Sequence, residues 1–188
     1  TNLRGPLPEV TGFPPLILIP TTVGTGAEAT RVAMFSVAGA KRIVTCPQFV
    51  PDLAVLDYEL VQDLPPAVIA ATAMDALSHC VESMMSTNAH DLTWLLGASA
   101  ARRIYARLPD AYNGTDPEAV GELLYASFLA GVALNAGVVL GHSLSYVLAS
   151  RHHLAHGTGC ALALPYALAY NRNMDPSIAN NIVSEVLG

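Results

Sequence analysis

Positive charge is scarce in this chain. Lysine and arginine together account for 9 of the 188 residues, against 15 aspartates and glutamates, and the formal net charge is −6. A protein that binds a phosphate backbone needs a basic stripe or patch, and this composition offers none. We therefore expect no nucleic-acid partner.

Cysteine is equally sparse. Cys46, Cys80 and Cys160 are far apart in the sequence and form no CxxC pair. An odd number of scattered cysteines is typical of reduced thiols in a cytoplasmic protein, and we interpret all three as core-packing residues. The first residues also lack the basic and then apolar layout of a signal peptide, so the predicted location is the cytoplasm.

One long stretch lacks charge altogether. Residues 123–150 contain no aspartate, glutamate, lysine or arginine, and a helix of that length can cross a bilayer. Against a membrane span, the stretch includes Asn135, His142 and three glycines, and only Arg151 follows it as an anchor. We predict buried core helices and no membrane partner.

The chain changes character near residue 62. Before it, short apolar runs predict strands, and their continuous pattern is typical of an α/β sheet covered on both faces. After it, Pro65 and Pro66 open the first of several predicted helices. The predicted strands are residues 16–19, 32–37, 42–46 and 54–56, and the predicted helices are residues 65–85, 90–108, 116–134, 137–149, 160–170 and those after 176. The sequence therefore predicts an α/β segment over residues 1–62 and an all-α domain over residues 63–188.

Four residues of the helical region are candidate metal ligands. Asp75 and His79 are four positions apart, so in a helix their side chains lie on one face and can converge on one ion. His142 and His156 are too far apart for that, because a straight helix would separate them by roughly 21 Å. Polar residues and glycines predict a break near residues 150–157, which would let the chain turn back.

The donor types indicate which ions the site would accept. One carboxylate and three imidazoles suit Fe(II), Zn(II) or Mn(II) better than calcium or magnesium. The set contains no thiolate, which argues against a zinc finger. Without the other three residues, His79 would more often be a core histidine with a satisfied hydrogen bond.

A second motif follows the first predicted strand at residues 20–28 (PTTVGTGAE). Glycines there let the backbone approach a phosphate, and threonine hydroxyls and exposed N–H groups can donate hydrogen bonds to it. The motif matches neither the P-loop nor the GxGxxG fingerprint. The alternative is a plain glycine turn that links a strand to a helix.

Taken in order, five motifs resemble the iron-containing (group III) alcohol dehydrogenase family. They are residues 19–28 (IPTTVGTGAE), 51–57 (PDLAVLD), 64–66 (LPP), 75–82 (DALSHCVE) and the spacing from His142 to His156. The resemblance covers nearly the whole chain. It implies an α/β remnant of a Rossmann-like, NAD(P)-binding domain over residues 1–62, followed by an all-α metal-binding domain over residues 63–188.

Carried over residue by residue, the resemblance implies metal ligands and cofactor contacts. The implied ligands are Asp75, His79, His142 and His156, with Fe(II) as the first candidate and Zn(II) or Mn(II) as alternatives. The implied contacts to NAD or NADP, near its phosphates, are Thr21, Thr22, Gly24, Thr25 and Gly26, with Lys41 as a further candidate.

The implied activity is hydride transfer between a small alcohol or aldehyde and NAD(P), with the metal acting as a Lewis acid on the substrate oxygen. Many members have a histidine where this chain has Tyr146. A tyrosine hydroxyl can replace it as a proton relay, although its pKa of about 10 makes it a poorer shuttle at neutral pH.

The chain also departs from the family pattern. It has no Gly-Gly-Gly-Ser-like pyrophosphate turn, and it ends before the further helices of the family, so we expect the middle of a protein about twice as long. Residues 163–171 (ALPYALAYN) also resemble maleylacetate and phosphonoacetaldehyde reductases. The alternative that is not an enzyme is a catalytically silent metal-binding helical module. The sequence also leaves open whether the protein forms a homo-oligomer.

Overall fold

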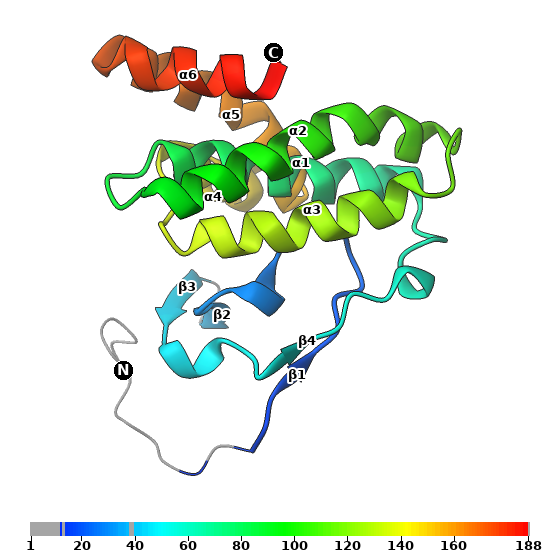
Figure 1. Cartoon of the computed structure of the whole chain (residues 1–188). Helices are drawn as coiled ribbons and strands as arrows, with labels where there is room; N and C mark the ends of the chain where they lie inside the picture. Colours follow the sequence, from blue (N-terminus) through cyan, green and yellow to red (C-terminus); the bar gives the residue numbers. More distant parts are fainter. Residues whose placement is uncertain (1–11, 13, 38–39, 188) are drawn as a thin grey trace.

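The computed structural model describes residues 12, 14–37 and 40–187, in which four short strands precede six α-helices. The strands are β1 (Ile17–Leu18), β2 (Val32–Val37), β3 (Ala40–Thr45) and β4 (Leu53–Ala54). The helices are α1 (Pro66–Met84), α2 (Asp91–Asn113), α3 (Ala119–Leu134), α4 (Leu140–His152), α5 (His156–Met174) and α6 (Pro176–Leu187). Figure 1 shows the helices stacked on one side and the strands gathered below them.

The strands form two separate pairs. β1 and β4 are parallel, with Ile17 opposite Leu53, whereas β2 and β3 form an antiparallel hairpin. Ile17 is 55% exposed and Leu53 is 51% exposed. The expectation of strands covered on both faces is therefore not met within the described residues, because each pair stands without the neighbouring strands and helices that would cover it.

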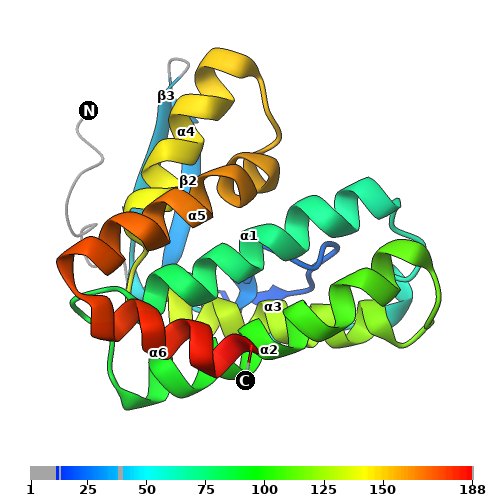
Figure 2. The same cartoon turned by 90° about the horizontal axis from the view of Figure 1, so that it is seen from above.

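α1 is the central helix of the helical layer. It begins at Pro66, as predicted from the two prolines, and it contacts each of the other five helices. One apolar cluster joins α1 to α2 and α3, and a second joins α1 to α5 and α6. Figure 2 shows α1 lying between the α4–α5 pair and the α2–α3 pair. Residues on α1 are thus held from several sides.

Several helix boundaries differ from the predicted ones, including those of α4, which begins and ends three residues later. α2 continues through Pro109 to Asn113, where the predicted helix ended at residue 108, and its last turn closes on Gly114 at φ 65°. α3 begins at Ala119 rather than at residue 116, since the Asp116 carboxylate pairs with Arg107 and caps the preceding turn. α5 begins four residues earlier than predicted.

The uncharged stretch at residues 123–150 does not form one helix. α3 ends at Leu134 and α4 begins at Leu140, with Gly137 in the break at φ 97°. A glycine is required there because side chains rarely adopt that backbone conformation. None of the helices in the described ranges combines the length and the apolar character needed to span a membrane.

The glycine turn after β1 packs closely against α3. A Cβ atom added to Gly131 would lie 2.3 Å from the Gly26 carbonyl oxygen, so only two glycines fit at this contact. Asn135 strengthens the contact, because its side chain donates to the Ala29 carbonyl oxygen at 3.0 Å and accepts from the Arg31 N–H at 3.2 Å. The strand segment is therefore fixed to the helical layer by the Gly26–Gly131 backbone contact and by the Asn135 side chain.

This contact generates a stability prediction. Gly131→Ala should lower the free energy of unfolding by about 1–3 kcal/mol, since the new methyl group meets backbone that cannot move aside. Gly97→Ala on α2 is the matched control, because its Cβ would first meet the flexible Met84 side chain at 3.3 Å. Urea denaturation measures both. Equal stability of Gly131→Ala and the parent chain would contradict the packing argument.

Candidate metal centre

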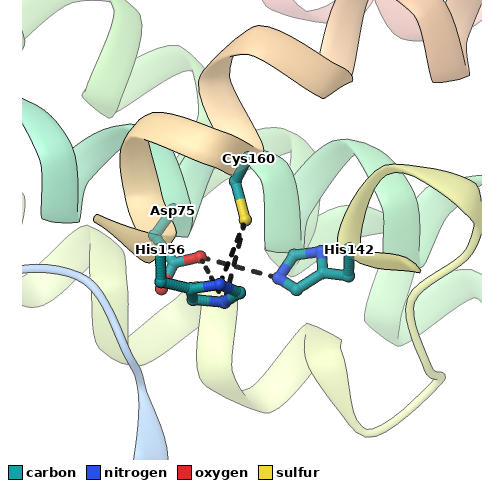
Figure 3. A group of neighbouring side chains, drawn as sticks. All are labelled: Asp75, His142, His156 and Cys160. Atoms are coloured by element: carbon teal, nitrogen blue, oxygen red, sulfur yellow. Dashed lines mark hydrogen bonds and ion pairs between the residues drawn. The ribbon is translucent and has the colours of Figure 1, made fainter. Parts of the chain in front are cut away.

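Three helices bring the candidate ligands together. α1 carries Asp75 and His79, α4 carries His142, and α5 begins at His156 and carries Cys160 one turn later. Figure 3 shows Asp75, His142, His156 and Cys160 converging from these helices. Asp75 is 6% exposed and His142 is 3% exposed, so the cluster lies in the interior of the protein.

The donor atoms of the four predicted ligands lie near one another. Asp75 Oδ1 is 3.5 Å from His142 Nε2, 3.5 Å from His156 Nε2 and 3.8 Å from His79 Nε2. The rings of His79 and His142 stack with their centroids 4.8 Å apart. The structure therefore brings all four residues to one place around the Asp75 carboxylate.

Cys160 belongs to the same cluster. Its Sγ lies 3.7 Å from His156 Nε2, and the ligand atoms of Asp75, His142, His156 and Cys160 are all within 4.8 Å of one another. The cysteine is fully buried. This burial agrees with the prediction of a core residue, and the structure adds that Cys160 borders the cluster.

Glu82 holds the His142 ring through the nitrogen that points away from Asp75. Its Oε1 accepts a hydrogen bond from His142 Nδ1 at 2.6 Å, which turns Nε2 toward Asp75. Its Oε2 accepts from the backbone N–H groups of Val139 at 2.9 Å and His142 at 3.3 Å. These are orphan donors at the start of α4, where a negative charge also meets the positive end of the helix dipole. Gly141 leaves room, because a Cβ there would lie 2.6 Å from Glu82 Oε1.

The protonation of the cluster is set by burial and by its own charges. Burial lowers the pKa of His142, but Asp75, Cys160 and Glu82 raise it more strongly, to about 12. Burial raises the pKa of Asp75, but His142 and the other imidazoles lower it more strongly, to about 2. Burial also lowers the pKa of His79 to about 4, against the attraction of Asp75. Without a bound ion, these shifts favour an ionised Asp75 carboxylate, a neutral His79 ring and a positively charged His142 ring at neutral pH.

The arrangement fits a divalent cation. Asp75 Oδ1 and His142 Nε2, which lie 3.5 Å apart, are buried and have no hydrogen-bond partner within the described residues. Buried polar atoms nearly always have partners, so such a group needs an explanation. A cation satisfies a carboxylate oxygen and imidazole nitrogens together, and it balances the charge of two buried carboxylates, Asp75 and Glu82.

A cavity of about 740 Å³ opens onto this cluster. Asp75, His79, His142 and His156 line it on the helical side, and residues of β1, β2 and β3 line the opposite side. Thr25 and Tyr146 also contribute to its wall. The Tyr146 ring stacks on His156 with the centroids 5.4 Å apart, and burial raises the pKa of its hydroxyl. A small molecule in this cavity would reach the cluster.

The predicted cofactor residues fall into three groups. Thr21, Thr22 and Thr25 line a smaller pocket of about 320 Å³ beside Glu28. Gly24 and Gly26 are buried against the helices. Close packing there already requires residues without side chains, independently of any contact with a cofactor. Lys41 lies in β3, and its side chain falls outside the described part of the structure. Their contact with NAD or NADP stays a prediction.

Comparison with known proteins adds independent information. The profile described as "Fe-containing alcohol dehydrogenase family, C-terminal" matches residues 69–188, and the profile described as "Iron-containing alcohol dehydrogenase" matches residues 4–58. Long-chain-alcohol dehydrogenase 1 of Geobacillus thermodenitrificans is 42% identical over 160 residues, which cover 84% of this chain and 40% of that protein.

Two solved structures have the same fold. An iron-containing alcohol dehydrogenase from Thermotoga maritima superposes with a TM-score of 0.87 at 30% identity, covering 94% of this chain and 49% of that one. Sulfoacetaldehyde reductase from Bifidobacterium kashiwanohense, in complex with NAD+, superposes with a TM-score of 0.79 at 27% identity, covering 92% and 52%. This chain spans about half the length of these proteins.

The chain belongs to the iron-containing alcohol dehydrogenase family. Its fold is the predicted one, a truncated Rossmann-like α/β part followed by an all-α domain. The division at residues 62 and 63 stays a prediction, although the last strand ends at Ala54 and the first α-helix begins at Pro66.

The role of Glu82 yields a prediction about metal affinity. Glu82→Gln keeps the size of the side chain but weakens the hydrogen bond that orients His142, so it should lower the affinity for Zn(II) about 10–100-fold. Competition with a chromophoric chelator measures the affinity. Glu59→Gln, at an exposed position, should leave it unchanged. A Glu82→Gln variant with the parent affinity would show that Glu82 only packs.

The raised pKa of His142 yields a prediction about pH. A ligating Nε2 must be free of its proton, so metal and proton compete for this atom. At pH about 7, binding should release at least one proton per ion, and affinity should fall as pH is lowered. Isothermal titration calorimetry in buffers of different ionisation enthalpy counts the protons. Binding without proton release would contradict the assignment.

Proposed function

We propose that the protein containing this chain is a metal-dependent oxidoreductase that transfers a hydride between a small alcohol or aldehyde and NAD or NADP. One observation carries the proposal: Asp75, His79, His142 and His156 converge from separate turns of three helices at the wall of a cavity, with unpartnered donor atoms buried among them. Such a group is suited to hold an ion that a substrate can reach.

The relatives support this chemistry. The Geobacillus protein is named a long-chain alcohol dehydrogenase, and the Bifidobacterium protein is named a sulfoacetaldehyde reductase and was solved with NAD+. Both names describe oxidation of an alcohol or reduction of an aldehyde. The shared fold and family make the same type of reaction the natural proposal for this chain.

Asp75, His79, His142 and His156 would hold the metal, with Fe(II) as the first candidate and Zn(II) or Mn(II) as alternatives. When bound, the ion supplies Lewis-acid stabilisation of negative charge on the substrate oxygen, and NAD(P) supplies the hydride carrier. Asp75 neutralises half of the charge of a divalent ion, and Glu82 holds His142 at the angle that ligation requires.

The walls of the cavity restrict what reaches the ligands. Apolar residues of β1, β2 and β3 face the cluster, among them Leu18, Met34 and Ile43. Such walls favour the carbon chain of an alcohol. Thr21, Thr22, Gly24, Thr25, Gly26 and Lys41 are the proposed contacts to the dinucleotide.

Tyr146 is the proposed proton donor. It lies on α4 one turn after His142, stacks on His156 and reaches the same cavity. Because burial raises the pKa of its hydroxyl, Tyr146 keeps its proton on Oη at neutral pH. A protonated hydroxyl beside the substrate oxygen suits aldehyde reduction, in which that oxygen must gain a proton.

A double variant tests the function. Asp75→Ala combined with His142→Ala removes the carboxylate and one imidazole, so the protein should lose its stoichiometric metal and its alcohol-dependent formation of NAD(P)H should fall at least about a hundredfold. Elemental analysis of anaerobically purified protein measures the metal, and absorbance of the reduced nicotinamide measures the rate.

Asp63→Ala combined with His152→Ala is the matched control, because both residues are exposed. It should keep metal and activity. Unchanged metal in the Asp75→Ala, His142→Ala variant would refute the ligand assignment. If the metal-loaded protein binds neither NAD nor NADP, the alternative of a catalytically silent metal-binding module replaces the enzyme proposal.

A further inference from the structure

We propose that Cys160 is an additional ligand of the bound metal, so that a thiolate joins the carboxylate and the imidazoles. The inference rests on the metal site of the proposed function and goes beyond it, because it assigns to the ion a donor that the sequence motif did not include. The structure places Cys160 Sγ within the cluster of Asp75, His142 and His156.

The distances between the donor atoms support this proposal. Ligands at tetrahedral positions on one zinc-like ion are about 3.4 Å apart for oxygen and nitrogen, and about 3.6 Å apart for sulfur and nitrogen, given bond lengths of about 2.1 and 2.3 Å. The Asp75 Oδ1 to His156 Nε2 distance is 3.5 Å, and the Cys160 Sγ to His156 Nε2 distance is 3.7 Å. Cys160 Sγ therefore lies at ligand spacing from His156 Nε2, and it is within 4.8 Å of the ligand atoms of Asp75 and His142.

The position of Cys160 on α5 also supports the proposal. His156 and Cys160 are one turn apart on α5, as Asp75 and His79 are on α1. Residues at i and i+4 lie on one face, so each helix presents two donors to the same point. Figure 3 shows the Cys160 sulfur pointing into the space between the two imidazoles and the carboxylate. The thiol is thus aimed at the position that the other donors surround.

Buried polar atoms without hydrogen-bond partners give a third line of support. Asp75 Oδ1 and His142 Nε2 are buried without hydrogen-bond partners in the described residues, and both belong to the same cluster as Cys160. They show, independently of the cysteine, that the cluster is built to receive a positive charge. Cys46 and Cys80 are also buried but belong to no such cluster among the described residues.

A thiolate changes which ions the site prefers. Soft sulfur donors bind Zn(II), Co(II) and Fe(II) in preference to Mn(II) or Mg(II), which favour oxygen. A chain with Cys160 among its ligands should therefore discriminate against Mn(II) more strongly than a site of one carboxylate and three imidazoles. His79 remains within reach as a further donor, at 3.8 Å from Asp75 Oδ1.

Cobalt substitution tests the proposal without measuring activity. The protein loaded anaerobically with one equivalent of Co(II) should show a sulfur-to-cobalt charge-transfer band in the near ultraviolet. Cys160→Ser should keep about one equivalent of Co(II) and lose this band. Cys46→Ser is the control and should retain it, because Cys46 lies outside the cluster and donates to Gln48.

X-ray absorption at the cobalt edge gives a second measurement that needs no variant. A sulfur scatterer at about 2.3 Å from the ion supports the proposal even if Cys160→Ser fails to fold or to bind. Stoichiometric Co(II) with only nitrogen and oxygen neighbours, and no charge-transfer band, overturns the role of Cys160 and leaves the proposed function intact. A parent chain that binds no Co(II) overturns both.

Discussion

The site depends on one buried carboxylate, that of Glu82, which is 0% exposed. It joins two helices that are distant in the sequence, because it extends from α1 and accepts hydrogen bonds from the first turn of α4 and from the His142 ring. A buried carboxylate is costly unless it is fully hydrogen-bonded, and here the helix start and the imidazole supply the donors. The same three bonds place α4 and aim the His142 Nε2 at Asp75.

Packing among the helices and strands positions the cavity walls around Glu82 and the candidate ligands. α1 packs against α2 and α3 in one apolar cluster and against α5 and α6 in a second, so Asp75 and Glu82 project from a helix with little freedom to shift. The Gly26 and Gly131 contact and the bonds of Asn135 then attach the strand segment to α3. As a result, Thr25 and the candidate metal ligands line the same cavity.

Local rules were enough to predict part of this arrangement. The four-residue spacing of Asp75 and His79 needed only a helix, and the break before His156 followed from polar residues and glycines. The start of α5 was missed because Gly157 resembles a helix breaker, whereas its real role is contact, since a Cβ there would lie 1.8 Å from the Ala71 carbonyl oxygen. The places of Glu82 and Cys160 depend on where α4 and α5 lie against α1, which no spacing within one segment determines. The i, i+4 relation of His156 and Cys160 was nonetheless a signal in the sequence.

Gly141 has a consequence for how this protein can diverge. With 2.6 Å between a would-be Cβ at position 141 and Glu82 Oε1, a side chain at position 141 would require the Glu82 carboxylate to move. Such a move would withdraw the carboxylate from the start of α4 and from the His142 ring. Positions 82 and 141 are therefore coupled, and an exchange at one of them changes what the other can accommodate.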